Sequence, residues 1–189
     1  SSSLYRDGED IKNRFNIKLQ GIDYDKKFVF EEIGYNLEPS EISAAFGLIQ
    51  LKKLKKHISL RRLFFKQQLK FFSNYKDLFI LPGENKNAVT GWLAFPLIVK
   101  KNKFFNRSDL QIFLENRNIQ TRVVLTGNIL RQPAFKNIKC KGNANEFKNS
   151  DNVMKNGILI GCHHGLNKQS INHIHESFKT FLSKSSKKN

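Results

Sequence analysis

The chain has 189 residues, of which 39% are hydrophobic, so it is long enough to bury a core of its own and is not intrinsically disordered. Its 33 Lys and Arg residues against 16 Asp and Glu give a net charge of +17, which raises the possibility of an anionic partner. The sequence contains no apolar run of the length that a membrane-spanning helix needs. The two cysteines, Cys140 and Cys162, have no CxxC spacing, and we therefore expect a reduced, cytoplasmic protein.

The N-terminal segment, residues 1–30, is polar and only weakly periodic. It predicts a loop with one short strand at residues 28–30. The segment has neither an initiator Met nor the apolar core of a signal peptide, so we expect the chain to begin within a longer protein.

A long helix is predicted to begin after Ser40, a good N-cap residue, with Glu41 placed favourably for the helix dipole. Apolar residues recur at helical spacing as far as about residue 73. The stripe predicted to be buried in the first half of this helix consists of Ile42, Ala44, Ala45, Leu48, Ile49, Leu51, Leu54 and Ile58. Residues 52–56 add four lysines, which fit either a nucleic-acid contact or a solvated helix surface. We favour the solvated surface because basic residues are spread along the whole chain.

A small unit of strands and helices follows. Residues 92–99 form an apolar run suited to a strand, in which Pro96 favours an edge position or a bulge. Ser108 and Gln111 fit a capping box for a short helix that ends at Asn118.

Two further strands and a final helix complete this unit. Residues 119–125 alternate as a strand does, and residues 158–160 form a second short apolar strand. Asn167 is placed to cap the last helix. The predicted inner face of that helix is formed by Ile171, Ile174, Phe178, and Phe181 or Leu182. The order of these elements predicts a small α+β domain attached to a long helix.

Three segments carry a family resemblance that extends over essentially the whole chain. The first is the Ile-Gly-Tyr-Asn-Leu run at residues 33–37 with the helix at residues 41–54. The second is Thr-Arg at residues 121–122 with Gly-Asn-Ile-Leu-Arg-Gln-Pro-Ala-Phe at residues 127–135, and the third is residues 160–166. In this order and spacing they resemble the DegT/StrS family of PLP-dependent sugar aminotransferases and dehydratases. The second segment resembles the nucleotide-sugar 3-dehydratase branch of that family.

The resemblance implies the α/β architecture of fold-type I PLP enzymes. Residues 1–39 would be a remnant of the large PLP-binding domain, residues 40–80 a connecting helix, and residues 81–189 a small C-terminal α/β domain with flanking helices. It also implies a homodimer with shared active sites, while the lack of a long apolar run predicts no membrane partner. The lysine or histidine that meets pyridoxal 5'-phosphate would lie before the first residue of this chain. We therefore assign no catalytic residue here and expect the chain alone to be inactive.

The parent protein implied by the resemblance modifies nucleotide-linked 4-keto-6-deoxyhexoses for surface polysaccharide or deoxysugar biosynthesis. An aminotransferase-like activity comes first, because it agrees best with the resemblance over the whole chain; with a lysine at the cofactor position, that lysine can shuttle the proton and an amino acid serves as the donor. A 3-dehydratase is the alternative, since a histidine there favours elimination of the 3-hydroxyl. A basic nucleic-acid-binding module and a non-catalytic truncated gene product are further alternatives.

Asn36 is the predicted cofactor-binding residue. Its amide can donate a hydrogen bond to a phosphate without adding charge, and the resemblance implies contact with the PLP phosphate of the partner subunit. The competing interpretation is an asparagine that fixes its own turn before the helix.

Arg122, Asn128 and Arg131 are predicted to contact the nucleotide-sugar substrate. A guanidinium can hold a diphosphate or sugar hydroxyls in a forked geometry. Chemistry alone does not distinguish this role of Arg122 from that of an ordinary surface arginine. The resemblance favours contact with the substrate. Asn128 and Arg131 are candidates of the same kind, in the loop between Gly127 and Pro133.

His163 is predicted to lie near the mouth of the substrate site. A metal site is not expected, because the adjacent residues His163 and His164 would point to opposite faces of a strand. His173 and His175 would similarly lie far apart around a helix. The other histidines are expected to be structural or exposed.

Overall fold

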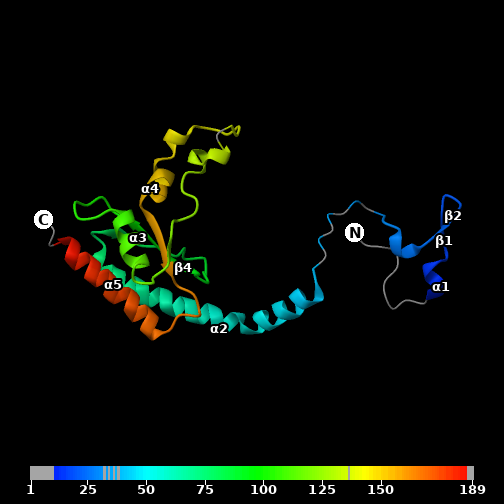
Figure 1. The fold of residues 1–189 in the computed structure, drawn as a ribbon, viewed down its shortest axis with the longest axis horizontal. Coiled ribbons are helices and arrows are strands. Elements are labelled where there is room, and N and C mark those ends of the chain that lie inside the picture. Colours follow the sequence, from blue (N-terminus) through cyan, green and yellow to red (C-terminus); the bar gives the residue numbers. More distant parts are fainter. Residues whose placement is uncertain are drawn as a thin grey trace. The chain divides into compact units, whose positions relative to one another are not determined.

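The computed structural model describes residues 11–31, 33, 35, 37, 39–135 and 137–186. The chain divides into two compact units, residues 1–52 and 53–189. Figure 1 shows the order of the elements along the ribbon. Among the described residues no helix has the length and apolar character needed to cross a membrane.

The first unit contains a small β-hairpin where the sequence predicted a loop. Its described elements before the long helix are α1 (Ile11–Arg14), β1 (Ile17–Leu19), β2 (Ile22–Tyr24) and the 3-10 helix η1 (Lys26–Phe28). Gln20 and Gly21 connect the antiparallel strands with φ values of 52° and 88°, the positive angles of a tight hairpin turn. The strand predicted at residues 28–30 is wrong at its first residue, because Phe28 belongs to η1. Asp25 instead caps η1 by accepting a hydrogen bond of 3.0 Å from the Lys27 amide.

The long helix α2 spans Glu41–Phe72, as predicted. The Ser40 hydroxyl accepts a hydrogen bond of 3.2 Å from the Ser43 amide, which confirms Ser40 as the N-cap. The prediction of a buried stripe in its first half is wrong for this chain: Ile42 is 84% exposed and most of the stripe is likewise exposed. The buried residues of α2 begin at Phe64, about two turns before the helix ends, and the preceding Leu60 is partly buried against the same core.

The second unit is built on a four-stranded sheet in the order β3-β4-β6-β5, with antiparallel neighbours. The strands are β3 (Phe79–Ile80), β4 (Ala94–Val99), β5 (Thr121–Arg122) and β6 (Gly157–Gly161). The edge position predicted from Pro96 is wrong, because β4 lies between β3 and β6. Pro96 is tolerated because it pairs with Leu159 of β6, whereas β3 reaches only Ile98 and Val99 on the other side.

Three helices accompany the sheet: α3 (Arg107–Glu115), α4 (Lys148–Asn156) and α5 (Lys168–Ser186). The capping box of α3 lies two residues earlier than predicted, since Asn106 and Asp109 exchange two hydrogen bonds of 3.0 Å. Asn167 caps α5 as predicted by accepting a 2.8 Å hydrogen bond from the Ser170 amide.

An aromatic core joins α2, the sheet and α5. The ring of Phe72 lies 5.4 Å from that of Phe95 in β4 and 4.8 Å from that of Phe178 in α5. These three side chains are fully buried. The second half of α2 and α5 therefore lie side by side beneath the sheet (Figure 1). The predicted inner face of α5 is confirmed by its buried residues Ile171, Ile174, Phe178, Phe181 and Leu182.

The long β5–β6 connection, residues 123–156, projects from the sheet (Figure 1). It contains α4 and the short 3-10 helices η3 (Ile129–Arg131), η4 (Pro133–Phe135) and η5 (Ala144–Glu146). Gly127 has a φ of 72°, and a Cβ at this position would lie 2.3 Å from the Cβ of Met154 in α4. The absence of a side chain at Gly127 therefore allows the start of the connection to pack against α4.

Candidate functional site

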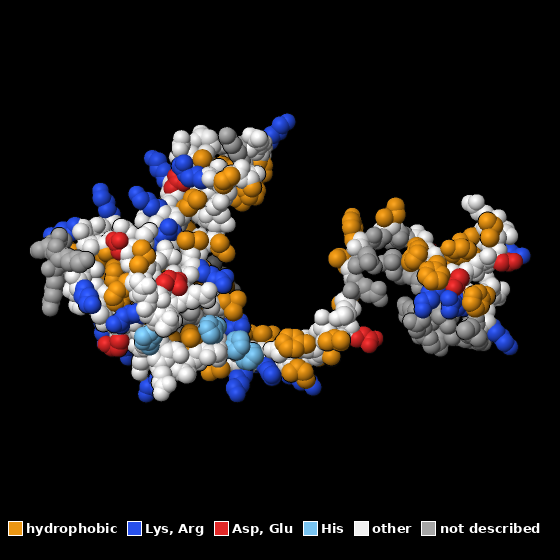
Figure 2. Space-filling model, in the orientation of Figure 1, with side chains coloured by type: hydrophobic (Ala, Val, Ile, Leu, Met, Phe, Trp, Pro, Cys, Tyr) orange, Lys and Arg blue, Asp and Glu red, His pale blue; other side chains and the backbone are white. Residues whose placement is uncertain are grey.

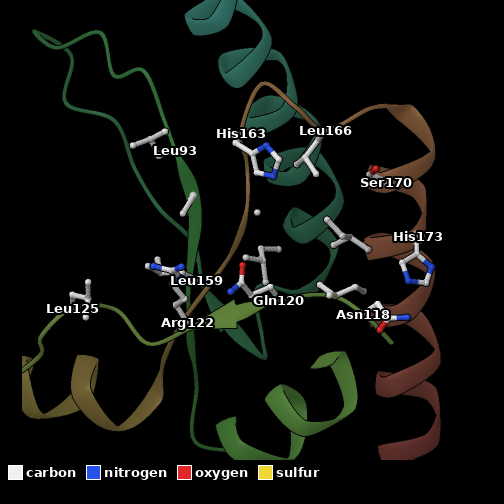
Figure 3. A pocket seen from close by; sticks show the side chains of 15 residues that line it. Leu93, Asn118, Gln120, Arg122, Leu125, Leu159, His163, Leu166, Ser170 and His173 are labelled. Carbon is white, nitrogen blue, oxygen red and sulfur yellow. The ribbon is translucent and has the colours of Figure 1, made fainter. Parts of the chain in front are cut away.

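A cavity of about 620 Å³ opens between β4, β6, β5 and the first half of α5 (Figure 3). We call it the sheet–helix cavity. Its walls combine apolar side chains with a few polar ones, which is typical of small-molecule sites. The lining residues are Leu93, Ala94, Asn118, Ile119, Gln120, Arg122, Leu125, Leu159, Ile160, Gly161, His163, Leu166, Ser170, His173 and Ile174.

The cavity brings together two of the predicted substrate residues, Arg122 and His163. Arg122 ends β5, and His163 stands in the turn that follows β6. Figure 3 shows His163, from the turn after β6, and Gln120, which directly precedes β5, directed toward the same space, with Arg122 on the β5 side. The two residues are 41 positions apart in the sequence, and the antiparallel pairing of β5 with β6 places them in one site.

The polar groups of the cavity favour a ligand that is anionic or rich in hydroxyls. The Gly165 amide donates a hydrogen bond of 3.2 Å to Nδ1 of His163, so the proton of the neutral ring lies on Nε2. Arg122 adds a guanidinium that remains exposed. No Asp, Glu or Lys occurs among the described residues that line the cavity.

Asn128 is not among the lining residues but fixes the β5–β6 connection. Its amide nitrogen donates hydrogen bonds of 2.8 Å to the Ala144 carbonyl and to the Asp151 carboxylate. Its side-chain oxygen accepts a 3.2 Å bond from the Leu130 amide, which caps η3. The residue is 2% exposed, so its hydrogen-bonding capacity is used within the connection.

Arg131 has an equally local set of partners. It forms a two-point contact with Asp151 at 2.5 and 2.7 Å and a further bond of 3.1 Å with Asn145. The hydrogen bonds from Arg131 and Asn128 lower the pKa of Asp151 to about 2. The structure therefore gives Arg131 a role in holding the connection, and the pair with Asp151 leaves it less available to a substrate.

Asn36, the predicted cofactor-binding residue, lies outside the described residues. The sheet–helix cavity itself does not fit PLP as a resident cofactor. Its described lining has no lysine that could form a Schiff base and no carboxylate that could pair with a pyridine nitrogen. The described residues of the cavity therefore supply no anchor for this cofactor.

Four further polar residues line the cavity and were not predicted from the sequence, namely Asn118, Gln120, Ser170 and His173. Gln120 stands two positions before Arg122, and side chains two positions apart in a strand lie on the same face. This spacing could have predicted that Gln120 lines the cavity with Arg122. Ser170 and His173 are three positions apart near the start of α5, a spacing that places them on one face of a helix. His173 also contacts the Arg117 carbonyl through Nε2 at 2.9 Å.

Two other titratable groups near α2 are structural. His175 faces away from the cavity, with its Nε2 2.9 Å from the side-chain oxygen of Gln68 and its ring stacked 4.0 Å from that of Phe71. Burial lowers the pKa of His175 to about 4. Burial also raises the pKa of the Cys162 thiol to about 12, which keeps it unreactive at neutral pH. The described part of the chain contains no group of three or more His, Cys, Asp and Glu residues suited to a metal ion.

The chain belongs to the DegT/DnrJ/EryC1/StrS aminotransferase family, whose model matches residues 4–179. This confirms the family resemblance and the fold class expected from the sequence.

Among curated proteins, the chain is 34% identical over 163 residues to dTDP-4-dehydro-2,6-dideoxy-D-glucose 3-dehydratase from Saccharopolyspora spinosa, covering 86% of this chain and 35% of that protein. It is 24% identical over 169 residues to dTDP-4-amino-4,6-dideoxy-D-glucose transaminase from Shigella dysenteriae, covering 88% and 44%. Its structure resembles that of E. coli GDP-4-keto-6-deoxy-D-mannose-3-dehydratase with bound hydrated PLP. That similarity has a TM-score of 0.66 at 30% identity and covers 80% of this chain and 38% of the other. The chain thus spans about a third of the length of the 3-dehydratases that it matches.

Proposed function

We propose that this chain is the C-terminal part of a PLP-dependent enzyme that modifies nucleotide-linked 4-keto-6-deoxy sugars, and that it supplies the substrate side of the active site. The observation that carries this proposal is the joining of Arg122 and His163 in one cavity of a chain from this family. The exposed first half of α2 supports it as well. Its first turns carry exposed apolar residues on several faces, such as Ile42, Phe46 and Leu48, and helices of this kind are normally enclosed by further protein.

Removal of the 3-hydroxyl is the reaction that we propose first. The sequence alone predicts an aminotransferase first and a 3-dehydratase second. The chain is 34% identical to a 3-dehydratase and 24% identical to a transaminase, and this difference reverses that order. PLP, bound elsewhere in the whole protein, would serve as the electron sink of either reaction.

The residues of this chain would bind and orient the sugar. The Arg122 guanidinium can take a phosphate oxygen or two sugar hydroxyls, and the Nε2–H of His163 and the amide of Gln120 can hold further oxygens. Leu159 and Leu166 form an apolar wall against which a deoxy carbon can pack. No proton transfer is assigned to these residues.

The family resemblance and the cysteines support the assembly and the location that we propose. We infer a homodimer with shared active sites, in which Asn36 meets the cofactor phosphate of the partner subunit. A cytoplasmic location is supported by the two free cysteines, of which Cys140 is exposed and Cys162 buried.

Product analysis of the whole protein tests the proposal. A 3-dehydratase would give a sugar that lacks the C3 oxygen and retains its ketone, and a transaminase would give a 4-amino sugar with the 3-hydroxyl intact. NMR of the sugar product separates the two. We expect the 189-residue chain alone to show neither PLP absorbance nor turnover. A yellow, active preparation of this chain would contradict the proposal that the cofactor is held by another part of the protein.

A further inference from the structure

A group of basic side chains lies next to the sheet–helix cavity and has no part in the site described above. The rings of His57 in α2 and His164 in the turn after β6 are stacked, with centroids 3.8 Å apart and planes inclined by 10°. Arg61, one turn after His57, approaches Nδ1 of His164 with its Nε at 3.3 Å and a terminal nitrogen at 3.2 Å. His163 precedes His164 and lines the cavity. We call these four residues the histidine–arginine cluster.

The hydrogen bonds of the cluster determine where its protons lie. A guanidinium can only donate, so Nδ1 of His164 accepts and the proton of the neutral ring is on Nε2. His163 has the same tautomer, because its Nδ1 accepts from the Gly165 amide. Both rings therefore offer an Nε2–H donor, and the Arg61 guanidinium has N–H groups beyond the two that approach His164.

The cluster also lacks a countercharge. No described Asp or Glu is paired with His57, Arg61, His163 or His164. The adjacent Arg62, by contrast, forms a two-point ion pair with Glu84. Burial lowers the pKa of His164, and the groups that face it, His57 and Arg61 from α2 and His163 from its own turn, lower it further. A half-buried guanidinium in contact with His164, whose ring stacks on His57, is thus an arrangement that an anion would complete.

We propose that the histidine–arginine cluster binds the diphosphate group of the nucleotide sugar, and that the sugar of the same ligand enters the sheet–helix cavity. The inference rests on the proposed function and deepens it. A diphosphate presents two adjacent anionic groups, and the cluster offers donors from two elements, with a guanidinium suited to two-point contact. His163 belongs to both the cluster and the cavity wall, so one ligand can reach both. Figure 2 shows histidine side chains beside lysine and arginine side chains on this part of the surface.

An NMR titration of the 189-residue chain with inorganic pyrophosphate tests the cluster directly. The ring signals of His163 and His164 should shift saturably, and the pKa of His164 should rise, because a bound anion stabilises the imidazolium. Arg61→Gln should weaken binding at least about tenfold, as expected for a lost charge-assisted contact. Arg61→Lys, which keeps the charge, should bind with intermediate affinity and guards against a folding defect in the first variant.

Lys70→Gln is the matched control, because it removes one positive charge from the exposed surface of the same helix. It should change the affinity by less than about twofold, since only screened long-range charge is lost. The absence of saturable shifts in the histidine rings would overturn the proposal. So would an equal loss of affinity in the Lys70 and Arg61 variants, which would show that only net charge attracts the anion.

A second titration, with a nucleoside-diphosphate sugar, separates this inference from the proposed function. We expect shifts in the cluster together with shifts of the Gln120 amide and the His173 ring, and tighter binding than for pyrophosphate. Cavity shifts with an affinity that Arg61→Gln leaves unchanged would refute the cluster as the diphosphate site while leaving the proposed function intact. Cluster shifts without cavity shifts, at the affinity of free pyrophosphate, would refute the nucleotide sugar as the ligand and contradict the proposed function.

Discussion

Mild acid should destabilise the second unit through His175. The side chain of His175 lies between α5 and α2, where it meets the Gln68 side chain and stacks on Phe71. Burial lowers its pKa in the folded chain to about 4, from an ordinary value of 6.5. Between these values the unfolded chain binds a proton that the folded chain does not, so stability falls as the pH drops through this range.

The size of the effect follows from the two pKa values. For values of about 4 and 6.5, the linkage relation gives a loss of about 2 kcal/mol at pH 5 relative to pH 7.5. His175 is only partly buried, so we expect about 1–2 kcal/mol after allowance for solvent screening. The carboxylates with lowered pKa values contribute mainly at more acidic pH, because their ordinary values are 4.5 or below.

Urea unfolding at pH 7.5 and at pH 5 measures this loss. His175→Gln keeps a donor for the Gln68 side chain but cannot titrate, so it should lose about 1–2 kcal/mol less than the wild type between the two conditions. His173→Gln, the same change at an exposed position of α5, should retain the wild-type pH dependence. An equal loss in the wild type and His175→Gln would refute the assignment of this effect to the buried imidazole.

Two further predictions concern the β5–β6 connection and the cavity. Gly127→Ala should lower the free energy of unfolding, measured in urea, by about 2 kcal/mol or more, because φ at this position is positive and the new Cβ would overlap Met154. Gly83→Ala is the control, since its Cβ would meet no atom and the change should be nearly neutral. Arg131→Gln should lower the melting temperature yet leave nucleotide-sugar affinity unchanged. Arg122→Gln should do the reverse, weakening calorimetrically measured affinity about tenfold with little effect on melting. The opposite assignment of effects to these two arginines would contradict the site described here.

Local patterns were sufficient to predict the helices that have strong signals in the sequence. Ser40 and Asn167 were found as N-caps because the capping residue and the helix lie within a few positions of each other. The α3 cap was placed wrongly, since both Asn106 and Ser108 are suitable capping residues and only the backbone geometry selects Asn106. The hairpin of β1 and β2 was missed because its strands are three residues long and largely exposed, which leaves no clear alternation to detect.

The site was predictable only in part, because its residues depend on tertiary partners. Arg122 and His163 were predicted and do share a cavity. Asn128 and Arg131 looked equally suitable in sequence, but Asp151, more than 20 positions away from Asn128, binds both of them in the fold. The exposed apolar residues of α2 show the same limit: helical spacing predicts an apolar stripe, but it does not say what packs against it.

Calorimetric titration of a nucleoside-diphosphate 4-keto-6-deoxy sugar into the 189-residue chain tests the central claim most directly. The claim is that this chain carries the substrate-binding side of the active site without the cofactor anchor. We predict saturable one-to-one binding in the absence of PLP that is weakened about tenfold by Arg122→Gln. Binding that is absent without PLP, or that is unaffected by Arg122→Gln, would contradict it.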